Sequence, residues 1–366
     1  MADVDLPVAG FAIPGELVAT AHFGSGHIHA TFVAEFNANA ETSRYVFQRL
    51  NERVFPDIAA VMDNLVRVLA HLDAKERPGA RRLSLVPTTA GSSYHRDPDG
   101  HAWRAFPFLE GTESLDSIES PGDAFEAARA FGAFASDLAD LPGPPLSVPI
   151  PHFHDLAQRF GDLQRAAAKN ISRRAERVST EIDRLRRWFD TVDAELLACD
   201  LDGQPRRIAH HDCKVNNVLF DRESRDAVCV VDLDTVMEGT LLSDFGELVR
   251  TAACPSPEDE IYRAGMHLDV EVLRALSHGY LMGAAPLVTD AELQVLPLAG
   301  LTLALMNAIR FLTDDLEGDR YFHVDREGHN LDRCRAQLRL VELLHEHREA
   351  TREILREAAG ELGLPR

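Results

Sequence analysis

The stretch HHDCKVNNVLF, residues 210–220, places two histidines, an aspartate, a lysine and two asparagines directly before an apolar run. Its spacing is H-x-D-x-K-x-x-N, formed by His210, Asp212, Lys214 and Asn217. Transfer of a phosphoryl group to a hydroxyl needs a carboxylate that accepts the hydroxyl proton, a cation beside the phosphoryl group, and oxygen ligands for Mg²⁺. One short loop offers all three, so this stretch predicts phosphoryl-transfer chemistry.

A second acidic position supports this interpretation. The strand-like run AVCVVDLD, residues 227–234, carries Asp232 at its end, where the side chain is placed to supply a second Mg²⁺ ligand beside Asn217. Two other interpretations are weaker. A turn with satisfied polar side chains explains an isolated H-x-D but not the whole pattern. A zinc site of His210, His211 and Asp212 is disfavoured because adjacent residues of an extended chain point in alternating directions.

Composition excludes several classes of partner. The chain has 366 residues, 45% of them hydrophobic, so it is long enough for two domains or one two-lobed unit. Lys and Arg total 38 against 59 Asp and Glu, and the formal charge of −21 opposes binding to nucleic acid or to anionic membranes. We therefore expect a small-molecule partner, with no nucleic acid and no membrane; the oligomeric state is left open.

The cysteines and the termini indicate the compartment. The five cysteines are scattered without a CxxC pair, so we expect free thiols. The N-terminus lacks the basic and apolar regions of a secretory signal. The apolar run of residues 295–309 contains Pro297 and Asn307 and is short for a membrane span, so we expect a buried helix and a cytoplasmic protein.

The chain changes character near residue 110. Up to that point it is rich in strand-like runs around one helix, and beyond it long helical patterns dominate. The strands are expected at residues 16–23, 29–36, 43–50, 82–88 and 101–109, and the helix at 56–72. Further helices are expected along the stripe Phe125, Ala128, Phe131, Ala135 and Leu138, from a Thr289–Glu292 capping box through Leu305, and from Leu331 to Ala359.

These patterns predict an α+β, two-lobed protein. Residues 1–110 are expected to form a small lobe with an antiparallel β-sheet that binds nucleotide. Residues 111–366 are expected to form a larger, mainly helical lobe with the catalytic loop and the substrate pocket, and a cleft between lobes is the default ligand site.

The catalytic-loop pattern and the later aspartate resemble the protein-kinase-like superfamily, whose signature is H-R-D-L-K-x-x-N followed by a metal-binding Asp. The resemblance implies a protein-kinase-like fold with ATP and Mg²⁺ as cofactors. It makes Asp212 the catalytic base, Lys214 the partner of the γ-phosphate, and Asn217 and Asp232 the Mg²⁺ ligands. His210 is then a structural brace of the loop.

The same resemblance assigns the nucleotide site. The turn in FGSGHIHATF, residues 23–32, becomes the phosphate loop with Gly24, Ser25 and Gly26, although an ordinary hairpin fits these residues as well. His27 at its exit is placed to reach the acceptor, or is an exposed turn histidine. The strand that carries a lysine in kinases offers Gln48 or Arg49, and we favour Gln48. Two residues of the connecting segment, Phe108 and Glu110, lie where kinases bind adenine.

Only eleven residues separate Asp232 from Asp244 in SDFGEL, so no activation segment fits and a protein substrate is disfavoured. This arrangement resembles the aminoglycoside-phosphotransferase-like small-molecule kinases, in which Asp244 is the structural residue that braces the catalytic loop.

A closer resemblance, to bacterial N-acetylhexosamine 1-kinases, covers blocks from YVFQRLNERVFPDIAAVMDN (45–64) to HNLDRCRAQLRLV (329–341). It implies transfer of the γ-phosphate of ATP to the anomeric hydroxyl of N-acetylglucosamine or N-acetylgalactosamine. Asp234 and Arg310 are then sugar contacts, with His27 the further substrate residue. Glu238 stands where the family is expected to have proline. Phe153 and His154 are interpreted as packing residues, and His211 and Asn216 receive no role.

Two alternatives stay open. One is a kinase for another hydroxyl compound, namely an aminoglycoside, an inositol or an amino alcohol; the negative charge of the chain would suit a cationic aminoglycoside. The other is a catalytically inactive, kinase-like binding module, which the neutral Gln48 favours slightly.

Overall fold

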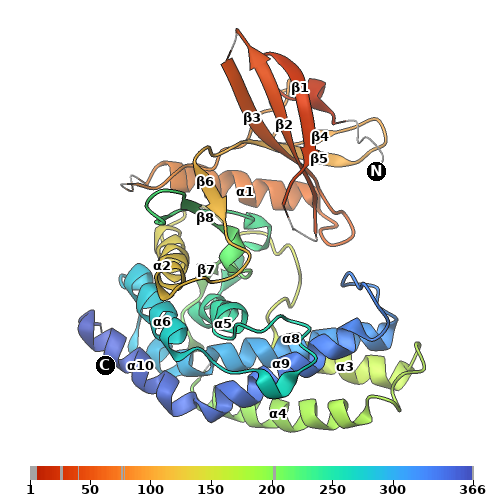
Figure 1. Cartoon of the computed structure of the whole chain (residues 1–366), viewed down its shortest axis with the longest axis vertical. Helices are drawn as coiled ribbons and strands as arrows, with labels where there is room; N and C mark the ends of the chain where they lie inside the picture. Colours follow the sequence, from red (N-terminus) through yellow and green to blue (C-terminus); the bar gives the residue numbers. More distant parts are fainter. Residues whose placement is uncertain are drawn as a thin grey trace. The chain divides into compact units, whose positions relative to one another are not determined.

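The computed structural model describes residues 6–24, 28–39, 41–75, 77, 79–200 and 203–364. The chain divides into two compact units (Figure 1). The smaller unit comprises Met1–Thr112 together with two later segments, Leu141–Ile150 and Leu233–Met237. The larger unit comprises Glu113–Asp140, Pro151–Asp232 and Glu238–Arg366. The small unit thus takes in a stretch that directly follows Asp232.

The small unit is built on one antiparallel sheet with the strand order β1-β2-β3-β5-β4 (Figure 1). Alternate residues point into a core that contains Phe11, Phe47 and Trp103. The edge strand β1 is exposed along its whole length. The strands are β1 Glu16–His22, β2 Ala30–Ala38, β3 Glu41–Arg49, β4 His95–Arg96 and β5 Ala102–Pro107.

Helix α1, Ile58–Asp73, is the one helix expected in this part of the sequence, and the structure confirms it. The Asp57 carboxylate caps it by accepting from the Ala60 N–H. Its apolar spacing buries Ile58, Val61 and Leu65 on one face.

The expectation of a strand at residues 82–88 is wrong. This segment runs in an extended form with only isolated bonds: Val86 N–H donates to the Ala105 carbonyl, and Phe11 bridges Thr88. Pro87 lacks an N–H and interrupts a continuous ladder. The short strand β4 takes the position next to β5 instead.

The larger unit is mainly helical, and in Figure 1 α2 lies beside α6 and α8 beside α9. The helices are α2 Pro121–Asp137, α3 Leu156–Lys169, α4 Ser179–Ala198, α5 Leu241–Ala252, α6 Val270–Ala284, α7 Asp290–Val295, α8 Ala299–Glu317, α9 His329–Glu346 and α10 Arg348–Glu361. Two small sheets complete the chain, β6-β8-β9 and β10-β7, with β6 Thr112–Ser114, β7 Arg207–Ala209, β8 Val218–Asp221, β9 Ala227–Val230 and β10 Met237–Gly239.

Helices α2 and α6 pack backbone against backbone. A Cβ atom on Gly132 would lie 2.4 Å from the Tyr280 carbonyl oxygen, and one on Gly279 would lie 2.2 Å from the Phe125 carbonyl oxygen. Both positions therefore require glycine. The close approach fixes α2, whose Phe131 and Phe134 contact the catalytic loop described below.

The central helix α8 was expected to begin at a capping box. The Thr289–Glu292 box is present, but it caps the short helix α7. Pro297 then forces a 3₁₀ turn, Leu296–Leu298, before α8 begins. The segment Asp290–Glu317 is long and apolar enough to span a membrane, yet 89% of its most apolar window is buried within the protein. This agrees with the expected buried helix.

The single helix expected from Leu331 to Ala359 is two helices, α9 and α10. The break is at His347, with φ −99° and ψ 9°. The apolar positions Leu338 and Leu344 before the break and Leu355 after it are all buried. The spacing thus identified the buried face correctly and missed the change of direction.

Candidate active site

The catalytic loop follows β7 and brings its polar side chains together. The Asp212 Oδ1 atom lies 3.0 Å from the Lys214 ammonium nitrogen. The Asn217 amide donates to Asp212 Oδ2 at 3.0 Å and to the Asp212 carbonyl at 2.8 Å. The two expected catalytic residues, Asp212 and Lys214, therefore form one cluster with the expected metal ligand Asn217.

The electrostatics of this cluster favour a charged carboxylate. Burial alone would raise the pKa of Asp212, but the positive charge of Lys214 and the hydrogen bonds from Lys214 and Asn217 lower it below its usual value. The same attraction raises the pKa of Lys214. Asp212 is thus held ionised, as an acceptor for a hydroxyl proton must be.

Replacing Lys214 by methionine should move the acid limb of the pH profile of kcat/KM to higher pH. Activity is lost as pH falls through the pKa of Asp212, and removing the cation that lowers this pKa raises it. The measurement is kcat/KM against pH for the wild type and Lys214→Met. The exposed Lys169, at the end of α3, gives the control Lys169→Met. An unmoved acid limb in Lys214→Met would contradict the assignment of that limb to Asp212.

A buried aspartate, Asp244, holds the backbone of the catalytic loop. The Asp244 carboxylate, in the first turn of α5, accepts from the His210 N–H at 2.9 Å and from the His211 N–H at 2.8 Å. His211 has φ +66°, an uncommon conformation for a residue other than glycine. Asp244 stabilises this turn of the backbone, and Asp212 is the residue that follows it.

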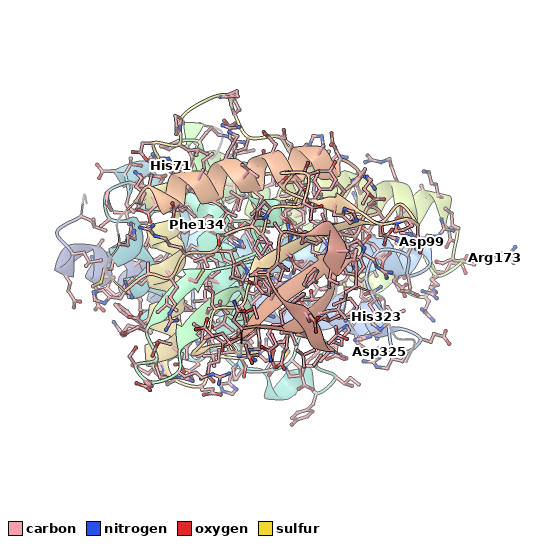
Figure 2. The ribbon with its side chains drawn as sticks, turned by 90° about the horizontal axis from the view of Figure 1, so that it is seen from above. His71, Asp99, Phe134, Arg173, His323 and Asp325 are labelled. Carbon is pink, nitrogen blue, oxygen red and sulfur yellow. The ribbon has the colours of Figure 1, made fainter. Side chains whose placement is uncertain are left out.

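The His210 ring braces the loop from a second direction. Its Nδ1 accepts from the Asp212 N–H at 3.2 Å, and its Nε2 donates to the Val231 carbonyl at 3.0 Å. Edge contacts to Phe131 and Phe134 of α2 enclose it; Phe134 is labelled in Figure 2. His210 is fully buried and has both ring nitrogens bonded.

The two expected metal ligands come from one hairpin. The Asn217 carbonyl accepts from the Val231 N–H at 2.9 Å, and Val218 pairs with Val230 across β8 and β9. This register sets Asn217 beside the segment that ends in Asp232, which has φ +60°.

This donor set fits Mg²⁺. The amide nitrogen of Asn217 donates to Asp212, which leaves the Asn217 Oδ1 as a ligand atom, and Asp232 would supply a carboxylate oxygen. A carbonyl and a carboxylate oxygen are ligands that Mg²⁺ prefers. When bound, the ion would offset the charge on phosphate oxygens.

The expected phosphate loop is described in part. Gly24 follows β1 with φ +79°, which favours glycine, and a Cβ there would meet nothing within 4 Å. Ser25, Gly26 and the expected substrate residue His27 lie outside the described residues. Only Gly24 of this group can be placed.

Gln48 lies on β3, directly opposite Arg104 of β5. Its Oε1 accepts from the Arg104 Nε at 2.8 Å, and its Nε2 donates to Thr31 at 3.4 Å. The alternative residue, Arg49, pairs with Trp103 in the same ladder. Gln48 therefore sits next to a buried cation, which the sequence did not indicate.

Phe108 and Glu110 lie in the segment after β5. The Phe108 N–H donates to the Arg44 carbonyl at 2.9 Å, and its ring contacts Phe23 and the Arg44 guanidinium. Glu110 binds Arg44 through its side chain, and its carbonyl accepts from Arg81. Both residues contact Arg44, and the Phe108 N–H and the Glu110 carbonyl are already hydrogen-bonded within the protein.

Asp234 was expected to contact a sugar, but in this structure its carboxylate is occupied. The Asp234 carboxylate accepts hydrogen bonds from both terminal nitrogens of Arg104. The His29 Nε2 atom lies 2.6 Å from Asp234 Oδ2. Burial alone would raise the pKa of Asp234, and Arg104 and His29 lower it far below its usual range. The side chain of Asp234 is 2% exposed.

Arg310, the other expected sugar contact, lies on α8 among aromatic rings. Its guanidinium carbon is 5.0 Å from the Phe153 ring, 5.7 Å from Tyr321 and 5.3 Å from Phe322. A terminal nitrogen of Arg310 donates to the Asn307 amide oxygen at 3.2 Å. Within the described part of the chain it forms no ion pair with a carboxylate.

The turn that carries Tyr321 and Phe322 is fixed by Asp314. This buried carboxylate accepts from the N–H groups of Arg320, Tyr321 and Phe322 at 2.8–3.0 Å. The Asn330 amide donates to it at 2.9 Å. The turn continues to the exposed residues His323 and Asp325, which Figure 2 labels close together.

A histidine pair next to the loop was missed by the sequence analysis. His211 Nδ1 lies 3.2 Å from His154 Nδ1, and the Phe153 ring stacks on His154. Burial lowers the pKa of both histidines, and the nearby His211 lowers the pKa of His154 further. His211 Nε2 also meets the carbonyl of Glu238, whose side chain is exposed. His211 directly precedes Asp212, whereas its partner His154 lies 57 residues earlier in the sequence.

An ion-pair network around the buried Arg250 of α5 was also missed. Arg250 binds Glu247 at 2.9 Å through Nε and Glu258 at 2.8 Å through a terminal nitrogen. Burial would lower the pKa of Arg250, but the two carboxylates raise it. The i, i+3 spacing of Glu247 and Arg250 in GELVR was the available signal.

Comparison with known proteins agrees with this geometry. Residues 22–287 match the model of the phosphotransferase enzyme family APH. The match spans more than half of the chain, so the chain belongs to this family.

Solved structures give the fold. An aminoglycoside phosphotransferase from Alicyclobacillus acidocaldarius has 14% identity and a TM-score of 0.62, with 99% of this chain and 98% of that chain covered. A microcompartment-associated aminopropanol kinase has 16% identity and a TM-score of 0.62, with 94% and 96% covered. Spectinomycin phosphotransferase, solved with ADP and spectinomycin, has 10% identity and a TM-score of 0.53, with 93% and 95% covered. The predicted two-lobed, kinase-like α+β fold is confirmed.

Proposed function

We propose that the protein is an ATP- and Mg²⁺-dependent kinase that transfers the γ-phosphate to a sugar hydroxyl, the anomeric hydroxyl of N-acetylglucosamine or N-acetylgalactosamine. Asp212 accepts the hydroxyl proton, Lys214 faces the γ-phosphate, and Asn217 and Asp232 bind the ion. Membership in the phosphotransferase family supports the reaction class. The ADP complex of spectinomycin phosphotransferase, a protein of the same fold, supports a nucleotide donor.

The residues around Arg310 are the observation that favours this acceptor. This cation lies among three rings and forms no carboxylate ion pair in the part of the chain that the structure describes. A second cation, Arg159, lies nearby: burial lowers its pKa, and the positive charge of Arg310 lowers it further. Two guanidinium groups repel an ammonium group and donate to carbonyl and hydroxyl oxygens.

This charge distribution favours a neutral acceptor with a carbonyl group over an aminoglycoside or an amino alcohol. Phe153 connects Arg310 to the catalytic loop, since its ring contacts both the guanidinium and His211. An N-acetyl sugar offers an amide carbonyl to the arginine and apolar ring faces to the aromatic side chains. The charge of the whole chain, −21, is therefore a poor guide to the surroundings of Arg310.

The test is ADP release with a panel of acceptors: N-acetylglucosamine, N-acetylgalactosamine, glucose, kanamycin, myo-inositol and ethanolamine. We expect turnover with the N-acetylhexosamines, and a phosphate on the anomeric carbon by ³¹P–¹H correlation. Turnover with only kanamycin, myo-inositol or ethanolamine would replace the proposed acceptor. ADP release with no compound of a wider panel of alcohols would favour the inactive binding module.

Replacing Arg310 by methionine should raise the KM for the N-acetylhexosamine by about 10- to 100-fold, because a charged hydrogen bond contributes roughly 1.5–3 kcal/mol. The KM for ATP should stay unchanged. The measurement is initial-rate kinetics with each substrate varied in turn. Arg320→Met, at an exposed arginine on the adjoining turn, is the matched control. Equal changes in both KM values would contradict a role in acceptor binding.

A further inference from the structure

The ion pair that kinases place in the small lobe is missing from its usual positions. In protein kinases a lysine on strand β3 pairs with a glutamate on the following helix. Here β3 has Gln48, and the buried polar residue of α1 is the neutral Asn64, whose amide bonds to the backbone of Ser147 and Val236. Neither of these two side chains carries a charge.

A different ion pair occupies the same unit. Arg104 of β5, directly across from Gln48, binds both carboxylate oxygens of Asp234, one at 2.7 Å. The side chains of Arg104 and Asp234 are each 2% exposed. Gln48 accepts from the Arg104 Nε at 2.8 Å, so the amide in the usual lysine position orients this arginine.

His29 completes the arrangement. Its Nδ1 accepts from the Asn51 N–H at 3.1 Å, so the ring proton is on Nε2 and donates to Asp234 Oδ2 at 2.6 Å. Asp234 therefore receives three hydrogen bonds from two side chains of the small unit. The carboxylate has little remaining capacity for a sugar hydroxyl.

The segment that carries Asp234 is continuous with a metal ligand. Asp234 lies in the 3₁₀ turn Leu233–Thr235, and Asp232 is joined to this turn with φ +60°. A left-handed backbone at a residue other than glycine is costly and persists where its surroundings hold it. Leu233 on one side of Asp234 and Val236 beyond it are buried as well.

We propose that Arg104 and His29 are positioning residues for the metal ligand Asp232: by holding the Asp234 carboxylate, they fix the backbone that presents Asp232. The inference rests on the proposed Mg²⁺–nucleotide site. It assigns Asp234 to the ordering of that site and not to the sugar. The buried ion pair of this unit joins β5 to the segment after the metal ligand, whereas in protein kinases it joins β3 to a helix.

The test measures metal binding directly. Electron paramagnetic resonance gives the affinity of Mn²⁺ for the complex of the protein with ADP, corrected for Mn²⁺ bound to free ADP. Outer-shell partners typically contribute about 10- to 100-fold to metal affinity. Arg104→Lys keeps the charge and loses the two-pronged contact, so we expect about a tenfold loss of Mn²⁺ affinity. Arg96→Lys, on the neighbouring strand β4, is the matched control and should bind Mn²⁺ as the wild type does.

Two further variants test the coupling. Asp234→Asn should weaken Mn²⁺ binding and leave the acceptor KM unchanged. Combined with Arg104→Lys, it should lose little more affinity than either single change, because the two residues act through one contact. If Arg104→Lys does not fold, His29→Ala tests the same carboxylate from its other side.

The outcomes separate this inference from the proposed function. Asp232→Ala should abolish Mn²⁺ binding in the nucleotide complex; retention of wild-type binding there would overturn the metal site itself. Loss in Asp232→Ala together with unchanged Mn²⁺ affinity in Arg104→Lys would overturn only the inference, even if Arg104→Lys melted at a lower temperature. An increase in the acceptor KM of Asp234→Asn with normal Mn²⁺ affinity would return Asp234 to the sugar site.

Discussion

Replacing Asp212 by asparagine should lower kcat by about 10²- to 10⁴-fold, the usual contribution of a positioned general base. The two side chains have nearly the same shape, so the asparagine still fits between Lys214 and Asn217, but its amide cannot accept the hydroxyl proton. The measurement is ADP release with saturating ATP and N-acetylhexosamine. Nucleotide affinity, followed by displacement of a fluorescent ADP analogue, should be unchanged.

The control for this variant is Asp226→Asn, in the exposed turn between β8 and β9. It makes the same chemical change away from the catalytic loop and should retain wild-type turnover. Near-full activity of Asp212→Asn would remove Asp212 as the base. A parallel loss of nucleotide affinity and kcat would instead indicate that the loop had moved.

The part of the site that the sequence predicts well is held together by the covalent chain. Asp212, Lys214 and Asn217 are within six residues, so their spacing alone brings them into one cluster. The same local pattern predicts a phosphotransferase. The change from a strand-rich to a helix-rich part of the chain predicts the two-lobed fold. The assigned roles of these residues remain predictions that the variants above test.

The part that the sequence does not predict depends on the register between distant strands. Arg104 and Asp234 are 130 residues apart, and only the pairing of β3 with β5 places Arg104 beside Gln48. A single sequence contains no signal for such a pairing. The contact of His154 with His211 was missed for the same reason.

Two misses had a local signal that was interpreted too narrowly. Pro297 was taken as evidence against a membrane span, but its missing N–H also ends α7 and starts a new turn before α8. Pro87 likewise prevents a regular strand at residues 82–88. In the segment of Pro297 the apolar pattern still identified a buried helix correctly, because burial depends on periodicity and not on where one helix ends and the next begins.

Replacing Asp244 by asparagine should have the second largest effect, on stability and turnover together. The carboxylate accepts one backbone N–H with each oxygen, whereas an amide has one oxygen and turns its NH₂ group toward the other N–H. A buried donor left without a partner costs about 1–3 kcal/mol. Because the affected amides belong to His210 and His211, Asp212 should lose its fixed position and kcat should fall with the stability.

Amide hydrogen exchange separates this explanation from general destabilisation. The peptide that contains His210 and His211 should lose protection in Asp244→Asn, while peptides of the helix pair α2 and α6 should exchange as in the wild type. Ser243→Ala, one residue earlier in the same buried helical turn, is the matched control. It leaves both backbone hydrogen bonds to Asp244 in place, so it should retain loop protection and kcat. Unchanged exchange at His210 and His211 in Asp244→Asn would show that the catalytic loop is held by its other contacts, those of the His210 ring with Val231, Phe131 and Phe134.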